Sequence, residues 1–241
     1  MTRIVDDLLI WGEGETMEEA AYNHDRHVES LLDRARHKHL KLNPEKFNFR
    51  KTEVKFAGYI LTNCGHKPDP GKIRALVEMP APSDVGGVRR FLGMTNYFAK
   101  YLNRLSEMTE PFRQLTNEAV EWQWSHEQDR AFREIKSAFA SAPVLTFFDK
   151  HSRTTTVQCD ASQSALGAVL MQNGRAVAYA SRMLSQAEEN YAQIEKTLLA
   201  VVFAMERFDH FMFGRHIVVE SDHKPLQAIR KKPNTAAPRR L

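Results

Sequence analysis

The segment VQCDASQSALGAVLMQNGRAVAYAS, residues 157–181, decides the fold of the last third of this 241-residue chain. Three short β-rich stretches are predicted at 154–160, 165–172 and 175–181, and the Asn173-Gly174 turn signal joins the last two. Three further elements follow: a long helix opening at Ser185 with a capping box to Glu188, a strand at 217–220 and a helix beginning at 225–229. The order βββαβα predicts an α/β domain whose mixed sheet is covered by helices.

Three acidic residues of this region stand out by their positions. Asp160 closes the first predicted strand, Asp222 closes the fourth, and Glu195 lies in the long helix. Glu195 shares its side of the helix with Tyr191 and Leu198, so we expect it to point toward the sheet. Converging carboxylates repel one another unless cations hold them, and Mg²⁺ prefers such oxygen ligands. The spacing also fits a Glu paired with an Arg and two strand-end Asp, so both interpretations stay open.

The N-terminal residues predict a strand, a turn and a second strand. TRIVDDLLIW, residues 2–11, places Asp6 and Asp7 at the tip between two apolar runs. Adjacent acids are also ordinary turn residues, so the pair alone is a weak sign of a metal site. A helix capped by Thr16 is predicted over 16–40, and alternating apolar residues predict a hairpin over 47–60.

The middle of the chain predicts a small basic helical bundle. A breaker segment at 67–71 precedes helices predicted over the ranges 71–79, 85–102, 108–116 and 127–140. In the second of these helices apolar residues line one side, which leaves the outer side for Arg89, Arg90, Lys100 and Arg104. Trp122 and Trp124 alternate as in a strand, and we expect them to pack rather than to stack on bases.

Composition limits the class of protein. A hydrophobic fraction of 42% excludes wholesale disorder. No apolar run could span a bilayer and no secretory signal opens the chain, so we expect an intracellular protein without a membrane partner. Cys64 and Cys159 form no disulfide framework, and His24 and His27 lack the cysteine partners typical of zinc sites.

The net charge is +4, from 34 basic and 30 acidic residues. Seven Lys and Arg lie between residues 36 and 55, and six lie after residue 223. These clusters favour a polyanion as partner, although solvated faces of a mildly basic protein would look the same.

Several ordered motifs identify a family resemblance. The segments 157–172 and 189–226 are preceded by four further motifs. These are IVDDLLIWG (4–12), KFAGYILTNCGHKPDPGKIRAL (55–76), VRRFLGMTNYFAKYL (88–102) and FREIKSAFASAPVLTFFD (132–149). Together they resemble the reverse transcriptase–RNase H region of Ty3/gypsy-type LTR retrotransposon Pol polyproteins. The resemblance implies four parts: the end of an α+β palm with a primer-contacting hairpin, a helical thumb, a connection and an RNase H-like domain. Their ranges are 1–62, 63–118, 119–152 and 153–241.

The resemblance also implies roles for particular residues. Asp160, Glu195 and Asp222 match the metal-binding acids of RNase H, and Asp6 with Asp7 matches the palm pair. The implied cofactor is Mg²⁺, with Mn²⁺ as an alternative. The implied partners are RNA–DNA hybrid, primer–template and the other parts of the Pol polyprotein. Contacts with nucleic acid are expected from Gly58, Tyr59, Arg89, Arg90 and Lys100.

Departures from the family pattern leave two hypotheses open. Ile4 stands in place of an aromatic residue, and Gly86 and Gly87 stand where the thumb has helix formers. The palm's third acid, the fingers and the last strand and acid of RNase H are not in this sequence. The first hypothesis is a part of an RNA-directed DNA polymerase and ribonuclease H. The second is a non-catalytic remnant that at most binds nucleic acid. We expect the chain alone not to extend a primer and to cleave hybrid RNA poorly.

Overall fold

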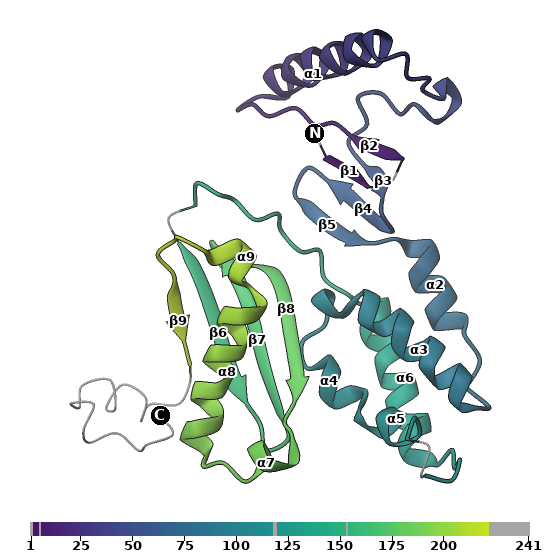
Figure 1. Ribbon diagram of the computed structural model, residues 1–241, viewed down its shortest axis with the longest axis vertical. Helices are drawn as coiled ribbons and strands as arrows, with labels where there is room; N and C mark the ends of the chain where they lie inside the picture. The colour runs from purple at the N-terminus through teal and green to yellow at the C-terminus, as the bar shows by residue number, and fades with distance from the viewer. Residues whose placement is uncertain (1, 5, 118–119, 153, 222–241) are drawn as a thin grey trace. The chain divides into compact units, whose positions relative to one another are not determined.

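The computed structural model describes residues 2–4, 6–117, 120–152 and 154–221. The chain forms two compact units, Met1–Asp69 and Pro70–Leu241 (Figure 1). Within the described residues, no helix combines the length and the apolar character needed to cross a membrane.

The first unit begins with the predicted strand, turn and strand. β1 (Thr2–Ile4) pairs antiparallel with β2 (Asp7–Leu9), and Ile4 lies opposite Asp7. The predicted helix is also present as α1 (Met17–His37). The side-chain oxygen of Thr16 accepts a hydrogen bond from the backbone N–H of Glu19, so the predicted N-cap is confirmed.

A three-stranded antiparallel sheet corrects the predicted hairpin. It follows the short 3₁₀ turn η1 (Pro44–Lys46) and consists of β3 (Val54–Phe56), β4 (Tyr59–Thr62) and β5 (Gly65–Pro68).

The prediction was wrong at both ends of this sheet. Phe47 and Phe49 lie before it and stack on each other at 5.8 Å between ring centroids, so their alternation reflects local packing and not a strand. Lys67 and Pro68, the start of the breaker segment predicted at 67–71, belong instead to the third strand, with Pro68 at its end opposite Tyr59.

The second unit opens with the helical segment. Its elements are α2 (Pro70–Glu78), α3 (Val85–Tyr97), η2 (Ala99–Tyr101), α4 (Leu105–Met108), α5 (Glu110–Gln114) and α6 (His126–Ala140). The helix predicted over 85–102 ends at Tyr97, and the one predicted over 108–116 is two short helices. Arg104, directly before α4, adopts a left-handed conformation with φ of 58°, which separates α4 from η2.

Aromatic side chains form the core of the helical segment. Phe91 is fully buried, and its ring lies 5.3 Å from Phe112 and 4.8 Å from Phe132 between centroids. The ring of Trp124 lies 5.8 Å from that of Phe132 between centroids and stacks beside Trp122. The expected packing of the two tryptophans is therefore confirmed, although their segment is not a strand.

The glycine pair at the start of α3 has a packing reason. The Gly87 N–H donates to the Asp84 carboxylate at 2.6 Å, which caps the helix. A Cβ on Gly87 would lie 3.1 Å from the Cβ of Pro82. Glycine at this position lowers the helix propensity of α3, but its missing side chain lets the preceding loop pack closely against the helix.

The predicted mixed sheet is confirmed. Its strands are β6 (Thr155–Ala161), β7 (Ala165–Gln172), β8 (Arg175–Met183) and β9 (Val218–Glu220). Their order is β8-β7-β6-β9, with β9 parallel to β6 and the other pairs antiparallel. Asn173 and Gly174 have φ of 51° and 73°, as the predicted two-residue turn requires.

The helices after the sheet differ from the prediction. α7 (Gln186–Glu189), α8 (Gln193–Arg207) and α9 (Asp209–Met212) replace the single long helix expected from Ser185. The Ser185–Glu188 capping box is confirmed, and Arg182 also binds Glu188, which lowers the pKa of that carboxyl to about 2. Figure 1 shows α8 lying across one face of the sheet. The helix predicted at 225–229 lies outside the described residues.

Candidate active site

Asp160 is exposed on one face of the sheet. Its neighbours Cys159 and Ala161 are buried in the core that contains Ala200 and Ala204 of α8. Because successive side chains of a strand point to opposite faces, the carboxylate of Asp160 lies on the face away from α8. The residue opposite it on β7 is Gly167. The neighbouring strand therefore places no side chain beside this carboxylate.

A cavity of about 480 Å³ lies over this face. Its polar lining comes from both parts of the second unit: Asn103, Arg104 and Glu107 from the helical segment, Gln158, Asp160 and Ser162 from β6 and its turn, and Glu220 and Ser221 from the end of β9. The predicted acid Asp160 is thus accessible in a cavity.

The register of β6 and β9 brings the two predicted strand ends together. Gln158 is paired with Glu220, and its side-chain N–H donates to the Glu220 carboxylate at 2.9 Å. Each of these residues is two positions before a predicted metal-binding acid. Asp222 itself lies outside the described residues, so its role stays a prediction.

Glu195 does not face the sheet, and this part of the prediction was wrong. The buried side chains near the start of α8 are Lys196, Thr197 and Ala200, whereas Val202, seven residues after Glu195, is 52% exposed. Glu195 accepts a hydrogen bond from the backbone N–H of Ala192 at 2.9 Å and so caps its own helix. Glu195 does not line the cavity over Asp160. Its metal-binding role stays a prediction.

The donor set fits a divalent cation only in part. Asp160 and Glu220 supply carboxylate oxygens to one cavity, and Mg²⁺ prefers such ligands. No three His, Cys, Asp or Glu side chains of the described residues are close enough to hold a metal ion together. The described residues alone do not make a complete metal site.

The other predicted acids, Asp6 and Asp7, lie at the tip of the first hairpin. Asp6 is in the turn and Asp7 is the first residue of β2, and both are exposed. They are adjacent in space as predicted, and their metal-binding role stays a prediction.

The predicted nucleic-acid residues have different surroundings. Gly58 has φ of 77° and forms the β3–β4 turn, and Tyr59 begins β4 as a half-buried residue. Arg89 and Arg90 are exposed on α3, as predicted. Lys100 is not on the outer side. It is partly buried with its Nζ 5.3 Å from the ring of Tyr101, and burial lowers its pKa to about 8.

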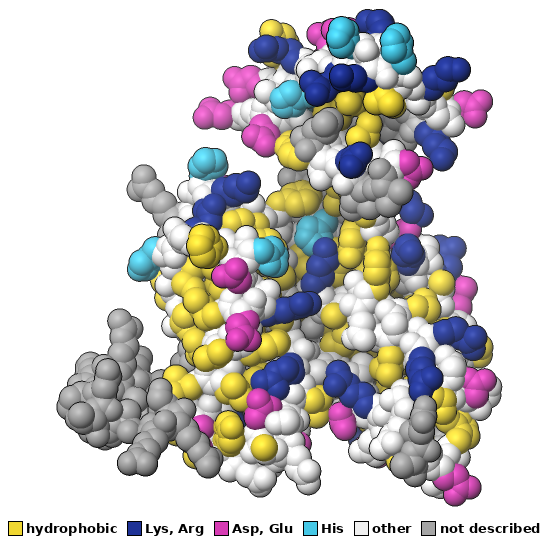
Figure 2. All heavy atoms as spheres, in the orientation of Figure 1, with side chains coloured by type: hydrophobic (Ala, Val, Ile, Leu, Met, Phe, Trp, Pro, Cys, Tyr) yellow, Lys and Arg dark blue, Asp and Glu magenta, His cyan; other side chains and the backbone are white. Residues whose placement is uncertain are grey.

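The basic cluster of residues 36–55 is partly neutralised by ion pairs. Arg36 pairs with Asp33, Arg50 with Asp25, and Lys55 with Asp69. The remaining cations of this cluster, Lys38, Lys41, Lys46 and Lys51, are exposed. Figure 2 shows Lys and Arg side chains interspersed with Asp and Glu on the visible face.

Sequence reasoning did not place two of the cavity-lining residues in the site. Arg104 and Glu107 come from the helical segment, more than 50 residues before Asp160 in the sequence. Neither residue belongs to a motif, and only the packing of α4 beside β8 brings them to the sheet.

The two cysteines provide a test of the described core. Burial raises the pKa of the Cys159 thiol to about 12, whereas Cys64 is exposed. The thiolate is the reactive form, so we expect iodoacetamide at pH 8 to modify Cys64 in the native chain and Cys159 only after denaturation. Mass spectrometry of peptides checks this, with Cys64→Ser as control. Rapid modification of Cys159 in the native C64S chain would contradict the described burial.

Comparisons with known proteins agree with this architecture. Residues 124–219 match the family model of the RNase H-like domain found in reverse transcriptase. The chain is 34% identical over 226 residues to the retrovirus-related Pol polyprotein from transposon 297 of Drosophila melanogaster, covering 92% of this chain and 20% of that protein. It is 31% identical over 245 residues to the Pol polyprotein from transposon gypsy of the same species, covering 97% and 23%. The chain thus spans about a fifth of the length of these relatives.

Solved structures share the fold. A foamy viral protease–reverse transcriptase in complex with double-stranded DNA matches with a TM-score of 0.80 and 23% identity over 92% of this chain and 39% of that one. Another structure of that protein, in complex with RNA/DNA hybrid, matches with a TM-score of 0.78, also at 23% identity, over 92% of this chain and 30% of that one.

Proposed function

Because this chain belongs to the retrovirus-related Pol polyproteins of gypsy-type LTR retrotransposons, we propose that its sheet domain hydrolyses the RNA strand of RNA–DNA hybrids. The observation that carries the proposal is the exposed carboxylate of Asp160, in a cavity that the end of β9 also lines. Asp6 and Asp7 would contribute to the polymerase site of the whole polyprotein.

Mg²⁺ is the proposed cofactor, with Mn²⁺ as a substitute. Asp160, Asp222 and Glu195 are the proposed ligands; in this structure one carboxylate oxygen of Glu195 accepts from the N–H of Ala192. A bound divalent cation would activate water and stabilise the leaving oxygen of a phosphoryl displacement. The chain's own contribution is an accessible carboxylate opposite Gly167, in a cavity that a phosphodiester could enter.

The proposed partners are RNA–DNA hybrid, primer–template and the rest of the Pol polyprotein, and the proposed location is inside the cell. The parts 1–62, 63–118, 119–152 and 153–241 are proposed as palm end, thumb, connection and RNase H-like domain.

A second candidate function is a remnant that binds nucleic acid without cleaving it. The capping role of Glu195 and its absence from the lining of the Asp160 cavity favour this alternative. The experiment that separates the two functions compares this chain with a continued form, extended beyond residue 241 through the last strand and acid of the RNase H family. Both are incubated with Mg²⁺ and a hybrid whose RNA strand is labelled. The first function predicts cleavage by the continued form and little by the short one. No cleavage by either form would leave binding as the function.

Binding of a hybrid is expected to depend strongly on salt. Each phosphate contact adds about 0.9 to the slope of log affinity against log salt, so a few contacts weaken binding by about tenfold or more between 50 and 200 mM. Replacing the exposed Lys38, Lys41, Lys46 and Lys51 with Gln should lower this slope. Fluorescence anisotropy with a labelled hybrid measures the slope, and Arg36→Gln, which removes a paired cation, is the control. An unchanged slope in the quadruple variant would exclude this cluster from the interface.

A further inference from the structure

Arg104 is the cation among the described residues that line the Asp160 cavity. The charged lining otherwise consists of the carboxylates Glu107, Asp160 and Glu220. These three acids repel a phosphodiester that approaches them, so a cation in the same cavity is needed to attract its phosphate. Arginine is suited to it because its planar guanidinium matches the geometry of a phosphate.

The backbone at this position would favour a different residue. Arg104 has φ of 58° and ψ of 24°, the left-handed region in which glycine carries no steric penalty. Such strain in a residue with a Cβ persists only where the surroundings fix it. The presence of a long cationic side chain here therefore points to a role of the side chain itself.

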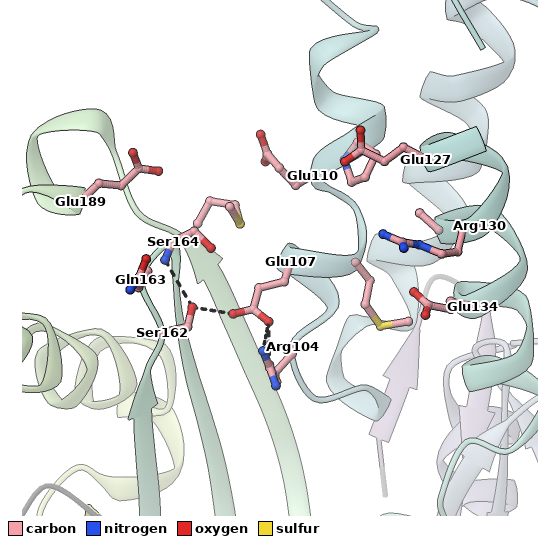
Figure 3. Close-up of a pocket in the computed structure, with 14 residues that line it drawn as sticks. Arg104, Glu107, Glu110, Glu127, Arg130, Glu134, Ser162, Gln163, Ser164 and Glu189 are labelled. Atoms are coloured by element: carbon pink, nitrogen blue, oxygen red, sulfur yellow. Dashed lines mark hydrogen bonds and ion pairs between the residues drawn. The ribbon is translucent and has the colours of Figure 1, made fainter. Parts of the chain in front are cut away.

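A short chain of hydrogen bonds holds Arg104 in place (Figure 3). One carboxylate oxygen of Glu107 accepts from Arg104 Nε at 2.6 Å and from Nη2 at 2.5 Å. The other accepts from the Ser162 hydroxyl at 2.6 Å. Ser162 also accepts from the backbone N–H of Ala165 at 3.0 Å, which fixes the turn that follows Asp160. Glu107 thus ties the guanidinium to the strand that carries the candidate acid.

The guanidinium keeps donors for a ligand. Its side chain is 60% exposed, whereas that of Glu107 is 21% exposed. Glu107 occupies the Nε and Nη2 side, and no described residue accepts a hydrogen bond from Nη1. Two N–H groups on Nη1 are therefore available for the oxygens of a phosphate.

We propose that Arg104 is a phosphate-binding residue that positions a hybrid strand in the Asp160 cavity, with Glu107 orienting its guanidinium. This inference rests on the proposed function and adds to it a contact from the helical segment to the substrate of the sheet domain. Arg104 and Glu107 also line an adjacent cavity of about 620 Å³, whose other charged residues are four glutamates and Arg130 (Figure 3).

The test measures binding of a labelled RNA–DNA hybrid in EDTA, where no cleavage occurs. Arg104→Gln is expected to weaken binding about tenfold at low salt and to lower the salt slope by about 1. Arg104→Gly should do the same while keeping or raising the melting temperature, because the backbone there favours glycine. Arg104→Lys keeps the charge and should restore the slope.

Arg133→Gln is the matched control. Arg133 is also exposed and also paired with an acid, Asp129, but it does not line the cavity, so we expect less than a twofold change. Arg104→Gly with the affinity and slope of the wild type would overturn the inference alone if the wild type binds hybrid and its continued form cleaves it. A wild type that binds no hybrid at low salt would overturn the proposed function as well.

Discussion

Asp160→Asn is expected to lower the rate of RNA hydrolysis by at least about 100-fold, measured in a form continued beyond residue 241. The substitution keeps the size of the side chain and removes its charge. Loss of a ligand that stabilises the transition-state charge costs several kcal/mol, and each 1.36 kcal/mol is tenfold in rate. Because Asp160 is exposed, the thermal unfolding midpoint should stay close to that of the wild type.

Two further substitutions make this result specific. Glu206→Gln removes an exposed acid of α8 and is expected to leave the rate unchanged. Glu195→Gln should reduce the rate as Asp160→Asn does if Glu195 is a ligand in the working enzyme. A rate near that of the wild type would instead restrict Glu195 to capping α8 at Ala192. Hydrolysis that survives in the Asp160→Asn variant would remove Asp160 from the site.

Phe91→Ala is expected to lower the free energy of unfolding of the second unit by about 3–5 kcal/mol. The ring is fully buried and contacts Phe112 and Phe132, so its removal leaves a cavity at the centre of the helical segment. Urea denaturation followed by tryptophan fluorescence suits the measurement, because Trp124 packs on the same cluster.

Phe213→Ala is the matched control for this loss. Its ring is 84% exposed, so removal should change the free energy by less than about 0.5 kcal/mol. A loss below about 1 kcal/mol for Phe91→Ala would contradict the described core.

Local signals in the sequence predicted most of the sheet domain. Asn173-Gly174 specifies a two-residue turn because both residues accept positive φ, and the β-rich stretches on either side of it predicted the strands. Ser185 with Glu188 predicted a helix start correctly. The sequence also predicts Asp160 at the end of a strand, and the residue is the last but one of β6.

The errors arose where the deciding contact is distant or the pattern is ambiguous. Apolar residues surround α8 on several sides, so periodicity did not mark its buried face. The small Ala200 and Ala204 approach the sheet, and this turns Glu195 away. The break between α7 and α8 added to the error about the face of Glu195, because a single helix from Ser185 would place Tyr191 on that face. The Glu107–Ser162 hydrogen bond joins residues 55 positions apart, which no local pattern encodes.

Strand-specific hydrolysis tests the central claim most directly. A hybrid labelled separately on its RNA and DNA strands is incubated with the continued form, with Mg²⁺ or with EDTA. The account predicts fragments of the RNA strand alone, only with the metal, and no cleavage of double-stranded DNA. An intact RNA strand at saturating protein, or cleavage of the DNA strand as well, would contradict it.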